Sequence, residues 1–385
     1  MGTAPLKTVR PFIIRPMKTI FIYFRRYPVL FISGICALAS ILVVPPDAQY
    51  LSYIDPQVIC LLFCLMAVTA GFQALGLFSR MAGWLLTKIH SLRGLYLVLI
   101  YLPFLSAMLV TNDVALLTFV PFALYMLRLA DAELYKIRIL VLQTIAANIG
   151  SMLTPIGNPQ NLFLYTAYQL DFGFFVSVTA LPVLATGLLL FLGVFLLPVR
   201  EIRIRRMESV SLPKGRTALY AILFLACLLS VFHLLPYWAL TGFVLLALLA
   251  SDRTLLLKVD YALLTTFLCF FIFSGNLSRL PGLKGFLKPL LASHPVLAPV
   301  LASQIISNVP AALLLSPFTN QARGLLLGVN LGGLGTLIAS LASVISFQFY
   351  SREPDQRTGA YLGWFSVLNF SLLLILLALT AILPF

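Results

Sequence analysis

The sequence predicts an all-α polytopic membrane protein. Of its 385 residues, 61% are hydrophobic and only 10% are charged, and the mean hydropathy is +1.02, far from the composition of soluble domains. Apolar runs of membrane-spanning length recur from residue 28 to residue 385, and they can satisfy their backbone amides in hydrocarbon only as helices. The bases lie in short stretches between these runs, as membrane topology requires, so we expect no nucleic-acid binding.

The apolar runs, and the Gly, Pro and charged residues between them, set the limits of nine predicted spans. These spans cover residues 28–44, 57–79, 138–168, 173–197, 217–235, 237–251, 261–277, 323–349 and 360–384. The first span follows a basic segment and lacks a small-residue cleavage site, so we expect a retained signal-anchor helix.

Two further apolar stretches are each interrupted near the middle by a polar tripeptide. Residues 94–128 contain Thr111-Asn112-Asp113, and residues 295–322 contain Ser307-Asn308-Val309. Each half is shorter than the ~20 residues that cross a bilayer at ~1.5 Å per residue. We therefore predict two re-entrant helical hairpins with these tripeptides at their tips.

The distribution of Lys and Arg predicts which loops share a side of the membrane. Residues 1–27 carry six bases and no acid, which predicts a cytoplasmic N-terminus in a bacterial inner membrane. Alternation then places the basic segment 200–216 in the cytoplasm and the C-terminus outside, provided that 94–128 returns to the side from which it entered. Four bases conflict with this scheme and are assigned to an amphipathic interfacial helix: Arg279, Lys284, Lys288 and Arg323.

An internal repeat can be aligned without gaps over two stretches of the chain. The interval from Thr111 to Pro121 equals that from Ser307 to Pro317, with Asn112 over Asn308. The second stretch pairs Asn148, Gly150, Thr154, Asn158 and Asn161 with Asn330, Gly332, Thr336, Ser340 and Ser343. Because the two hairpins open to opposite sides in the charge scheme, the repeats are predicted to be inverted. We divide the chain into a basic N-terminus (1–27), repeat one (28–197), a basic loop with a linker helix (198–236) and repeat two (237–385).

The segment from Asn148 to Asn161 is predicted to be a broken helix in the middle of its span. It contains two prolines, two glycines and three asparagines, and each interior proline costs ~3 kcal/mol and removes a backbone hydrogen bond. Broken helices persist in membranes where the freed amides and carbonyls line a cavity or face a ligand. The alternative is a kink that neighbouring helices repack. The equivalent segment of repeat two, 330–343, has glycines and no proline.

Asp113 is the one acid that the sequence places deep within the membrane. The other eleven acids fall in loops or at span ends, and no Lys or Arg is placed at comparable depth. A lone buried carboxylate costs several kcal/mol unless it is protonated, paired or bound to a cation. We therefore expect a proton or Na⁺ as its partner, the alternative being a permanently protonated structural Asp.

Three motifs resemble those of the ion transporter superfamily: the two hairpin tips, Thr111-Asn112-Asp113 and Ser307-Asn308-Val309, and the segment from Asn148 to Asn161. This superfamily includes arsenite permeases, D-type sodium/proton antiporters and citrate and dicarboxylate symporters. The chain is most similar to compact bacterial anion-transporter-like permeases of unassigned substrate. In the dicarboxylate branch each hairpin tip carries Ser-Asn-Thr and binds sodium and substrate carboxylates together with the broken helix. The third tip position departs in both hairpins here, to Asp113 and Val309, which argues against a di- or tricarboxylate cargo.

The resemblance and the repeat together imply a set of substrate- and ion-binding residues. They are Thr111, Asn112, Asp113, Asn148, Gly150, Thr154, Gly157, Asn158, Asn161, Ser307, Asn308, Asn330, Gly332, Thr336 and Ser340. Within this set, Na⁺ is expected at Asn112, Asp113, Asn158 and Asn308.

The sequence thus predicts a secondary active, elevator-like transporter that moves a small anion or oxyanion coupled to H⁺ or Na⁺. The alternatives are a Na⁺/H⁺ antiporter and an arsenite or antimonite exporter, and a channel or structural scaffold is a third class. No His/Glu metal signature, Walker loop or nucleophile elbow is present, so we expect no enzyme activity and no cofactor beyond the coupling ion. The expected partners are the lipid bilayer and a small solute, and a homodimer remains open.

Overall fold

A computed structural model of the chain describes residues 27–77, 80–81, 89–196, 201 and 213–382. Nearly all of the predicted basic N-terminus (1–27) and much of the basic loop therefore lie outside the described residues. The described part is helical and contains no strand beyond an isolated bridge between Ser91 and Glu201. Seven of its helices are long and apolar enough to cross a membrane. The predicted all-α polytopic membrane fold is confirmed.

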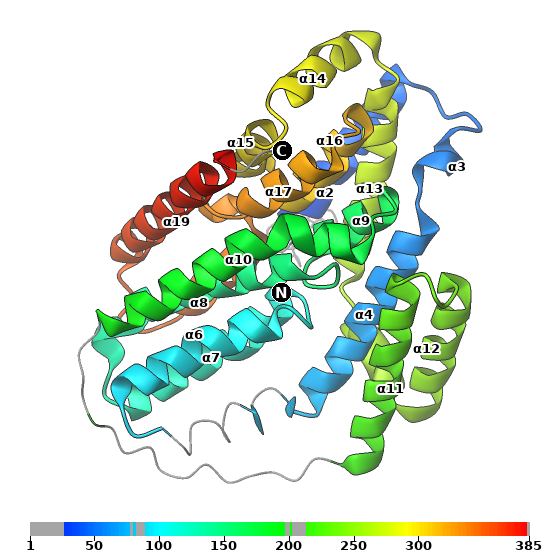
Figure 1. Cartoon of the computed structure of the whole chain (residues 1–385). Helices are drawn as coiled ribbons and strands as arrows, with labels where there is room; N and C mark the ends of the chain where they lie inside the picture. Colours follow the sequence, from blue (N-terminus) through cyan, green and yellow to red (C-terminus); the bar gives the residue numbers. More distant parts are fainter. Residues whose placement is uncertain (1–26, 78–79, 82–88, 197–200, 202–212, 383–385) are drawn as a thin grey trace, which may run out of the picture.

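The described residues of the first half form eight α-helices and two short 3₁₀ segments (Figure 1). They are α2 (Pro28–Val43), α3 (Tyr50–Tyr53), α4 (Pro56–Ala74), α6 (Leu92–Ser106), α7 (Asn112–Leu129), η1 (Glu133–Tyr135), α8 (Lys136–Gly150), η2 (Ser151–Leu153), α9 (Pro159–Ala167) and α10 (Phe172–Phe195).

The described residues of the second half follow a similar order of elements after helix α11. Its elements are α11 (Lys214–Val231), α12 (Tyr237–Ser251), η3 (Arg253–Lys258), α13 (Tyr261–Ser278), α14 (Pro281–Ser293), α15 (Leu297–Ile306), α16 (Asn308–Leu315), η4 (Ser316–Phe318), α17 (Ala322–Leu331), η5 (Leu337–Ala339), α18 (Leu341–Tyr350) and α19 (Thr358–Ala381).

In both predicted hairpins the second helix begins within the polar tripeptide, α7 (from Asn112) in the first and α16 (from Asn308) in the second. The first hairpin pairs α6 with α7 and turns at Thr111, whose backbone is extended. The second pairs α15 with α16 and turns at Ser307, whose φ of 75° lies in the left-handed region that few residues other than Gly adopt. The prediction that each half is too short to cross a bilayer is wrong for α7, which is 18 residues long and apolar enough to cross.

Both broken helices are interrupted where the sequence predicts. In the first repeat α8 ends at Gly150 and the chain is extended at Thr154 and Asn158 before Pro159 begins α9. Proline suits this first helical position because its missing N–H would have no partner there. In the second repeat, Gly335 has a φ of +104°, so a glycine produces the break that prolines produce in the first.

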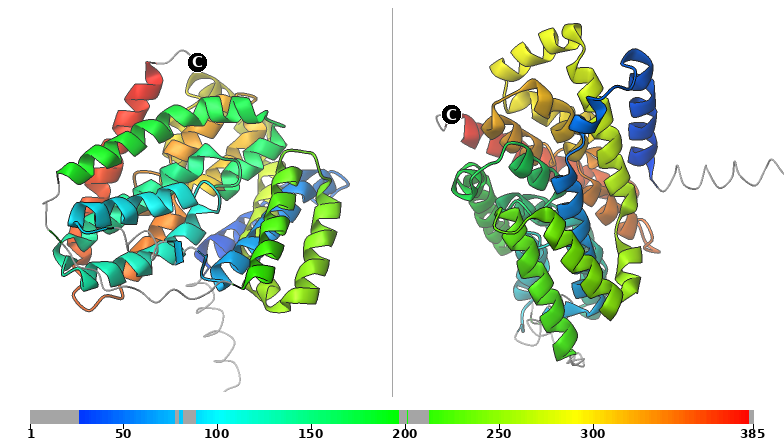
Figure 2. Two further views of the ribbon diagram at one scale, coloured as in Figure 1. Left: turned by 60° about the horizontal axis from the view of Figure 1, so that its bottom comes forward. Right: turned by 90° about the vertical axis from the view of Figure 1, so that its right-hand side faces the viewer.

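The helices form two groups. One group, which we call the α4 bundle, consists of α2, α4, α11, α12 and α13; the other, the hairpin bundle, consists of α6–α10 and α15–α19. Figure 1 shows α4, α11 and α12 on one side of the molecule, with α6, α7, α8 and α19 on the other, and the left view of Figure 2 shows the same division. Helices α4 and α13 contact the hairpin bundle through α9 and α16.

Contacts between loops agree with the predicted alternation. Four segments that the charge scheme places outside are joined in two pairs. Arg279 lies 2.8 Å from Asp47 in an ion pair, and the hydroxyl of Tyr168 donates to the carbonyl oxygens of Ser316 and Thr319.

Loops assigned to the cytoplasmic side are joined in the same way. Arg128 forms an ion pair with Glu353, and the buried Lys136 pairs with Asp355. Because Arg128 and Lys136 flank the loop after the first hairpin, these pairs support a hairpin that returns to the side of the 351–357 loop.

The four bases that conflict with the charge scheme do not share one helix, contrary to the prediction. Lys284 and Lys288 lie on the exposed helix α14, whereas Arg279 follows α13 and Arg323 lies in the first turn of α17. The amphipathic helix therefore accounts for two of the four.

The inverted topology predicts that Cys substituted for Arg93 and Cys substituted for Arg128 label from the same, cytoplasmic side. These residues begin and end the first hairpin. The measurement is labelling of intact cells and of inverted vesicles with a membrane-impermeant maleimide, in a background without native cysteines. Gln49→Cys, in the exposed loop before α3, is the control for the outer side. Labelling of the two hairpin positions from opposite faces would refute the hairpin.

Candidate functional site

A buried network of side-chain amides and hydroxyls lies where the two repeats meet. The Oδ1 of Asn148 accepts hydrogen bonds from Asn112 Nδ2 and from Ser340 Oγ, each at 3.0 Å. Its Nδ2 donates to Ser343 Oγ at 3.2 Å. Asn148 therefore ties the tip of the first hairpin to the broken helix of the second repeat.

A second set of bonds joins the broken helix of the first repeat to Asn330 of the second repeat. Asn158 Nδ2 donates to Asn330 Oδ1 at 3.2 Å and to Ser151 Oγ at 3.1 Å. Asn330 Nδ2 donates to Asn161 Oδ1 at 2.6 Å. Asn161 in turn donates to backbone carbonyls of the interrupted segment, including that of Thr154.

The two sets are related by the internal repeat. Exchanging positions 148 with 330, 158 with 340 and 161 with 343 turns the Asn148–Ser340 bond into the Asn330–Asn158 bond, and the Asn148–Ser343 bond into the Asn330–Asn161 bond. A two-fold relation between repeats requires this exchange. The network therefore supports the residue-by-residue alignment made from the sequence.

Equivalent bonds also hold each hairpin to the broken helix of its own repeat. Thr154 Oγ1 donates to the carbonyl oxygen of Met108 at 2.5 Å, and Thr336 Oγ1 donates to that of Gln304 at 3.0 Å. Met108 and Gln304 each precede their tip asparagine by the same interval. Both predicted threonines thus fix the hairpins rather than face a cavity.

The hairpin tips make a similar equivalent contact with the interrupted segments. The backbone N–H of Asn112 donates to the carbonyl oxygen of Gly157 at 3.0 Å, and Ser307 Oγ donates to the carbonyl oxygen of Ala339 at 3.3 Å. A Cβ at Gly157 would lie 2.0 Å from the carbonyl oxygen of Ser151. Glycine is therefore needed here for close approach of backbone segments.

A cavity of about 140 Å³ lies beside this network, at the boundary between the two bundles. Three of the predicted site residues line it, namely Thr111, Asp113 and Asn158. Asn112 and Asn148 are buried behind the cavity in the amide network. Of the remaining predicted residues, those of the second repeat and Gly150, Thr154, Gly157 and Asn161 support the interrupted segments and do not line this cavity.

Four polar residues that the sequence did not indicate also line the cavity. Thr69 and Gln73 come from α4, and Lys258 and Asp260 come from the connection between α12 and α13. The sequence places Lys258 and Asp260 in a loop, but η3 folds against α4 and brings them to the cavity. The sequence placed no base at the depth of Asp113, and the structure adds Lys258 to the lining of the same cavity. No sequence motif marks these residues, because their position depends on the packing of η3.

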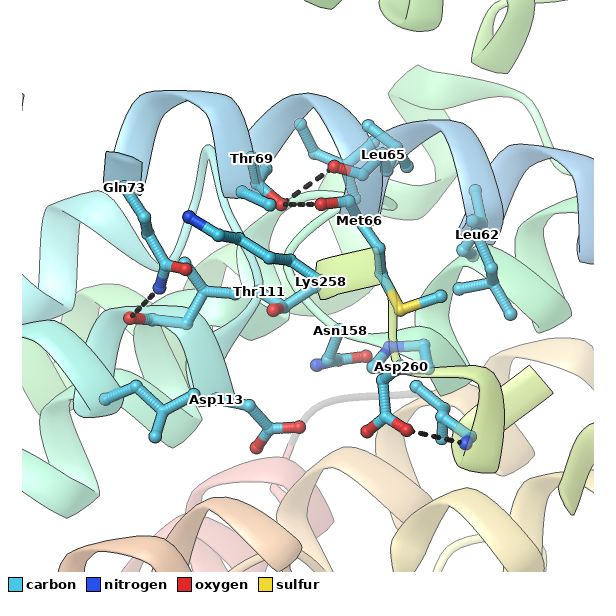
Figure 3. Close-up of a pocket in the computed structure, with 17 residues that line it drawn as sticks. Leu62, Leu65, Met66, Thr69, Gln73, Thr111, Asp113, Asn158, Lys258 and Asp260 are labelled. Carbon is cyan, nitrogen blue, oxygen red and sulfur yellow. Dashed lines mark hydrogen bonds between the residues drawn. The ribbon is translucent and has the colours of Figure 1, made fainter. Parts of the chain in front are cut away.

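The charged groups of the cavity are separated in space (Figure 3). The carboxylates of Asp113 and Asp260 lie on one side with the Asn158 amide, whereas the ammonium of Lys258 points toward Gln73 on the other side. The cavity thus has an acidic side and a basic side.

Three helices begin at this cavity. Thr111, Asn158 and Asp260 are the N-cap residues of α7, α9 and α13, and all three line the cavity. Helix N-termini carry roughly half a positive charge each and favour negative groups. Together with Lys258 they roughly offset the two carboxylates.

The oxygen atoms at the cavity fit a proton or a hard cation. Asp113, Asp260, Thr111 and Asn158 supply carboxylate, hydroxyl and amide oxygens, the ligands that such cations prefer. Two other members of the expected Na⁺ set are differently placed. Asn112 Oδ1 accepts the N–H of Asp113 at 3.0 Å.

Asn308 is the other member, and its Oδ1 accepts the N–H of Val309 at 2.9 Å. Both tip asparagines therefore use this oxygen to close the first turn of the following helix. Within the described residues, no group of three or more His, Cys, Asp or Glu side chains is arranged to hold a metal.

The model of the citrate transporter family, CitMHS, matches residues 12–326, a range that includes both hairpins and the first broken helix. The chain belongs to the citrate transporter family. It is therefore a multi-pass membrane transporter, and the family is one of transporters rather than enzymes.

Curated relatives agree with this assignment. An uncharacterized transporter of Methanocaldococcus jannaschii, MJ0456, is 32% identical over 274 residues, which are 70% of this chain and 74% of the relative. The inner membrane protein YbiR of Escherichia coli K12 is 31% identical over 337 residues, 84% of this chain and 89% of the relative. The silicon efflux transporter LSI3 of Oryza sativa subsp. japonica is 31% identical over 146 residues, 38% of this chain and 29% of the relative.

Proposed function

We propose that this member of the family is a secondary active transporter of a small, weakly acidic oxygen compound, coupled to H⁺ or Na⁺ at Asp113. The observation that carries the proposal is the meeting of three helix N-termini, two carboxylates and one lysine at a single cavity. The elements of this arrangement come from both bundles.

Charge compensation favours a neutral or singly charged cargo. The N-termini and Lys258 roughly offset Asp113 and Asp260, so an added trivalent anion would have little positive charge to stabilise it. A proton or Na⁺ at the carboxylates would leave a net positive field, which suits one small oxyanion. Binding of the cation and of the cargo would then favour each other, which is the requirement for coupling.

The names of the relatives bear on the cargo without fixing it. The family carries the description citrate transporter, whereas the rice relative is named a silicon efflux transporter. Silicic acid and arsenite are both largely uncharged hydroxides at neutral pH, and both fit a cavity whose charges nearly cancel. We therefore place metalloid hydroxides and small oxyanions ahead of di- and tricarboxylates.

The carboxylate pair favours one alternative, a Na⁺/H⁺ antiporter. In that case Asp113 and Asp260 would themselves be the exchange site, and no oxygen compound would bind. The elevator-like motion is the same in both cases: the hairpin bundle carries Thr111, Asp113 and Asn158 past the α4 bundle. The candidate residues in the amide network act in this proposal by holding the hairpin tips in place.

A ligand-dependent stability screen of the purified protein tests the class of cargo. Arsenite, silicate, phosphate, sulfate, citrate, succinate, Na⁺ and Li⁺ are compared at equal ionic strength. A ligand at 100 times its Kd stabilises the folded state by ~2.7 kcal/mol, so we expect a rise of several degrees in Tm with one of the first four ligands. A rise with citrate or succinate alone would contradict the proposal, and a response to Na⁺ and Li⁺ alone would favour the antiporter.

A further inference from the structure

Lys258 lies in the cavity but belongs to neither a hairpin nor a broken helix. It is the last residue of η3, which packs against α4. Its side chain is exposed, and it is the one base among the described residues that line the cavity. Its ammonium points toward Gln73 (Figure 3).

The two acids of the cavity differ in their freedom and in the bundle that carries them. Asp260 accepts the N–H of Leu263 at 3.0 Å as the N-cap of α13, so it is fixed to the α4 bundle. Asp113 lies in the first turn of α7, in the hairpin bundle. In the described part of the chain, Lys258 forms no ion pair with either carboxylate, and its four-carbon side chain is free to swing between them.

We propose that Lys258 pairs with Asp113 whenever that carboxylate is ionised, and that a proton or cation on Asp113 releases the pair and allows the hairpin bundle to move. This role rests on the proposed function, because it assumes coupled movement of the two bundles. A partly buried carboxylate without a counter-charge costs several kcal/mol. Since η3 stays with the α4 bundle, the pair can form only in the arrangement that places the first hairpin tip opposite η3.

The other charged groups around Lys258 do not respond to a proton or cation in the way proposed for Asp113. Asp260 is held by the first turn of α13. Asp252, at the start of η3, interacts with Lys258 and Arg216, and its hydrogen bond from the Thr254 hydroxyl holds the pKa of Asp252 below its usual value. It therefore remains ionised at neutral pH. Helix α4 contributes only uncharged groups, Thr69 and Gln73.

A crosslink across the boundary reports the arrangement directly. Gln73 Nε2 on α4 lies 3.5 Å from Thr118 Oγ1 on α7, so Gln73→Cys and Thr118→Cys place two thiols on opposite bundles. In full-length protein without native cysteines, the rate of crosslinking by a short bis-maleimide is measured at about pH 6 and about pH 8, with and without Na⁺. Each rate is divided by the rate at which a monofunctional maleimide labels the same protein at the same pH, because the reactive thiolate fraction itself rises with pH. No cargo is needed.

We expect the normalised crosslinking rate to be several-fold faster at the higher pH and slower in Na⁺. Lys258→Gln should lower the normalised rate at the higher pH several-fold and remove its pH dependence, and Lys258→Arg should restore both. Lys284→Gln, on the exposed helix α14, is the matched control and should behave as the parent.

An unchanged rate and pH dependence in Lys258→Gln would overturn the proposal. If the double-cysteine protein does not fold, hydrogen exchange in the first turn of α7 is compared in the parent and in Lys258→Gln at the higher pH. We expect exchange to be slower in the parent, where the pair with Lys258 forms. Because both measurements omit cargo, this role can fail while oxyacid transport holds, and it can hold if the stability screen finds a different cargo.

Discussion

Replacement of Asp113 by Asn is expected to abolish uphill transport while leaving the fold intact. The amide is nearly isosteric with the carboxylate, and the one bond that the structure gives this residue locally, from its backbone N–H to Asn112 Oδ1, is retained. The substitution removes a costly charge, so stability should be unchanged or higher. A neutral side chain cannot exchange a proton or hold Na⁺ as a counter-charge, and coupling is lost.

The measurement is gradient-driven uptake in proteoliposomes, with cargo chosen by the stability screen. We expect accumulation to fall by at least roughly tenfold, equivalent to ~1.4 kcal/mol or more of lost coupling. Asp171→Asn is the matched control, because Asp171 caps α10 and does not line the cavity, and Asn is an equally good cap. An Asp113→Asn protein that still concentrates cargo with unchanged ion dependence would make Asp113 a structural residue.

Replacement of Gly150 by Ala is expected to lower stability strongly. Gly150 ends α8, and a Cβ there would lie 2.1 Å from the carbonyl oxygen of Phe104 in α6. The obstacle is backbone, so the helices α6 and α8 would have to separate and the first hairpin would shift. We expect a loss of about 3 kcal/mol or more in the free energy of unfolding, read as a fall of roughly 10 °C in Tm.

Gly193→Ala is the control for this substitution. Gly193 lies within α10, and a Cβ there would meet no atom within 4 Å. Alanine is the better helix former by about 1 kcal/mol, so Tm should stay the same or rise slightly. Equal Tm values for the two variants would contradict the close α6–α8 contact.

The sequence was sufficient for the parts of the site that depend on local chemistry. Polar tripeptides in apolar runs located both hairpin tips, and the prolines around Asn158 located the first broken helix. The alignment also identified which asparagines and serines are equivalent, and the exchanged bonds of Asn148 and Asn330 follow that equivalence.

Features that depend on packing between distant segments could not be predicted in this way. Lys258 and Asp260 precede an ordinary span in the sequence, and only the contact of η3 with α4 brings them to the cavity of Asp113. The length of α7 was underestimated because its polar first turn, which begins at Asn112, was counted as a break rather than as helix. Charge counting likewise could not tell that Arg323 lies at the start of α17.

The proposed function requires that the protein move its cargo uphill by using an ion gradient. Uptake of radiolabelled or chemically assayed cargo, arsenite first, is measured in proteoliposomes that contain the unmodified protein under an imposed pH or Na⁺ gradient. We expect accumulation above the external concentration, and we expect it to collapse when an ionophore removes the gradient. Equilibration that never exceeds the external concentration, whatever gradient is imposed, would contradict it and indicate a channel.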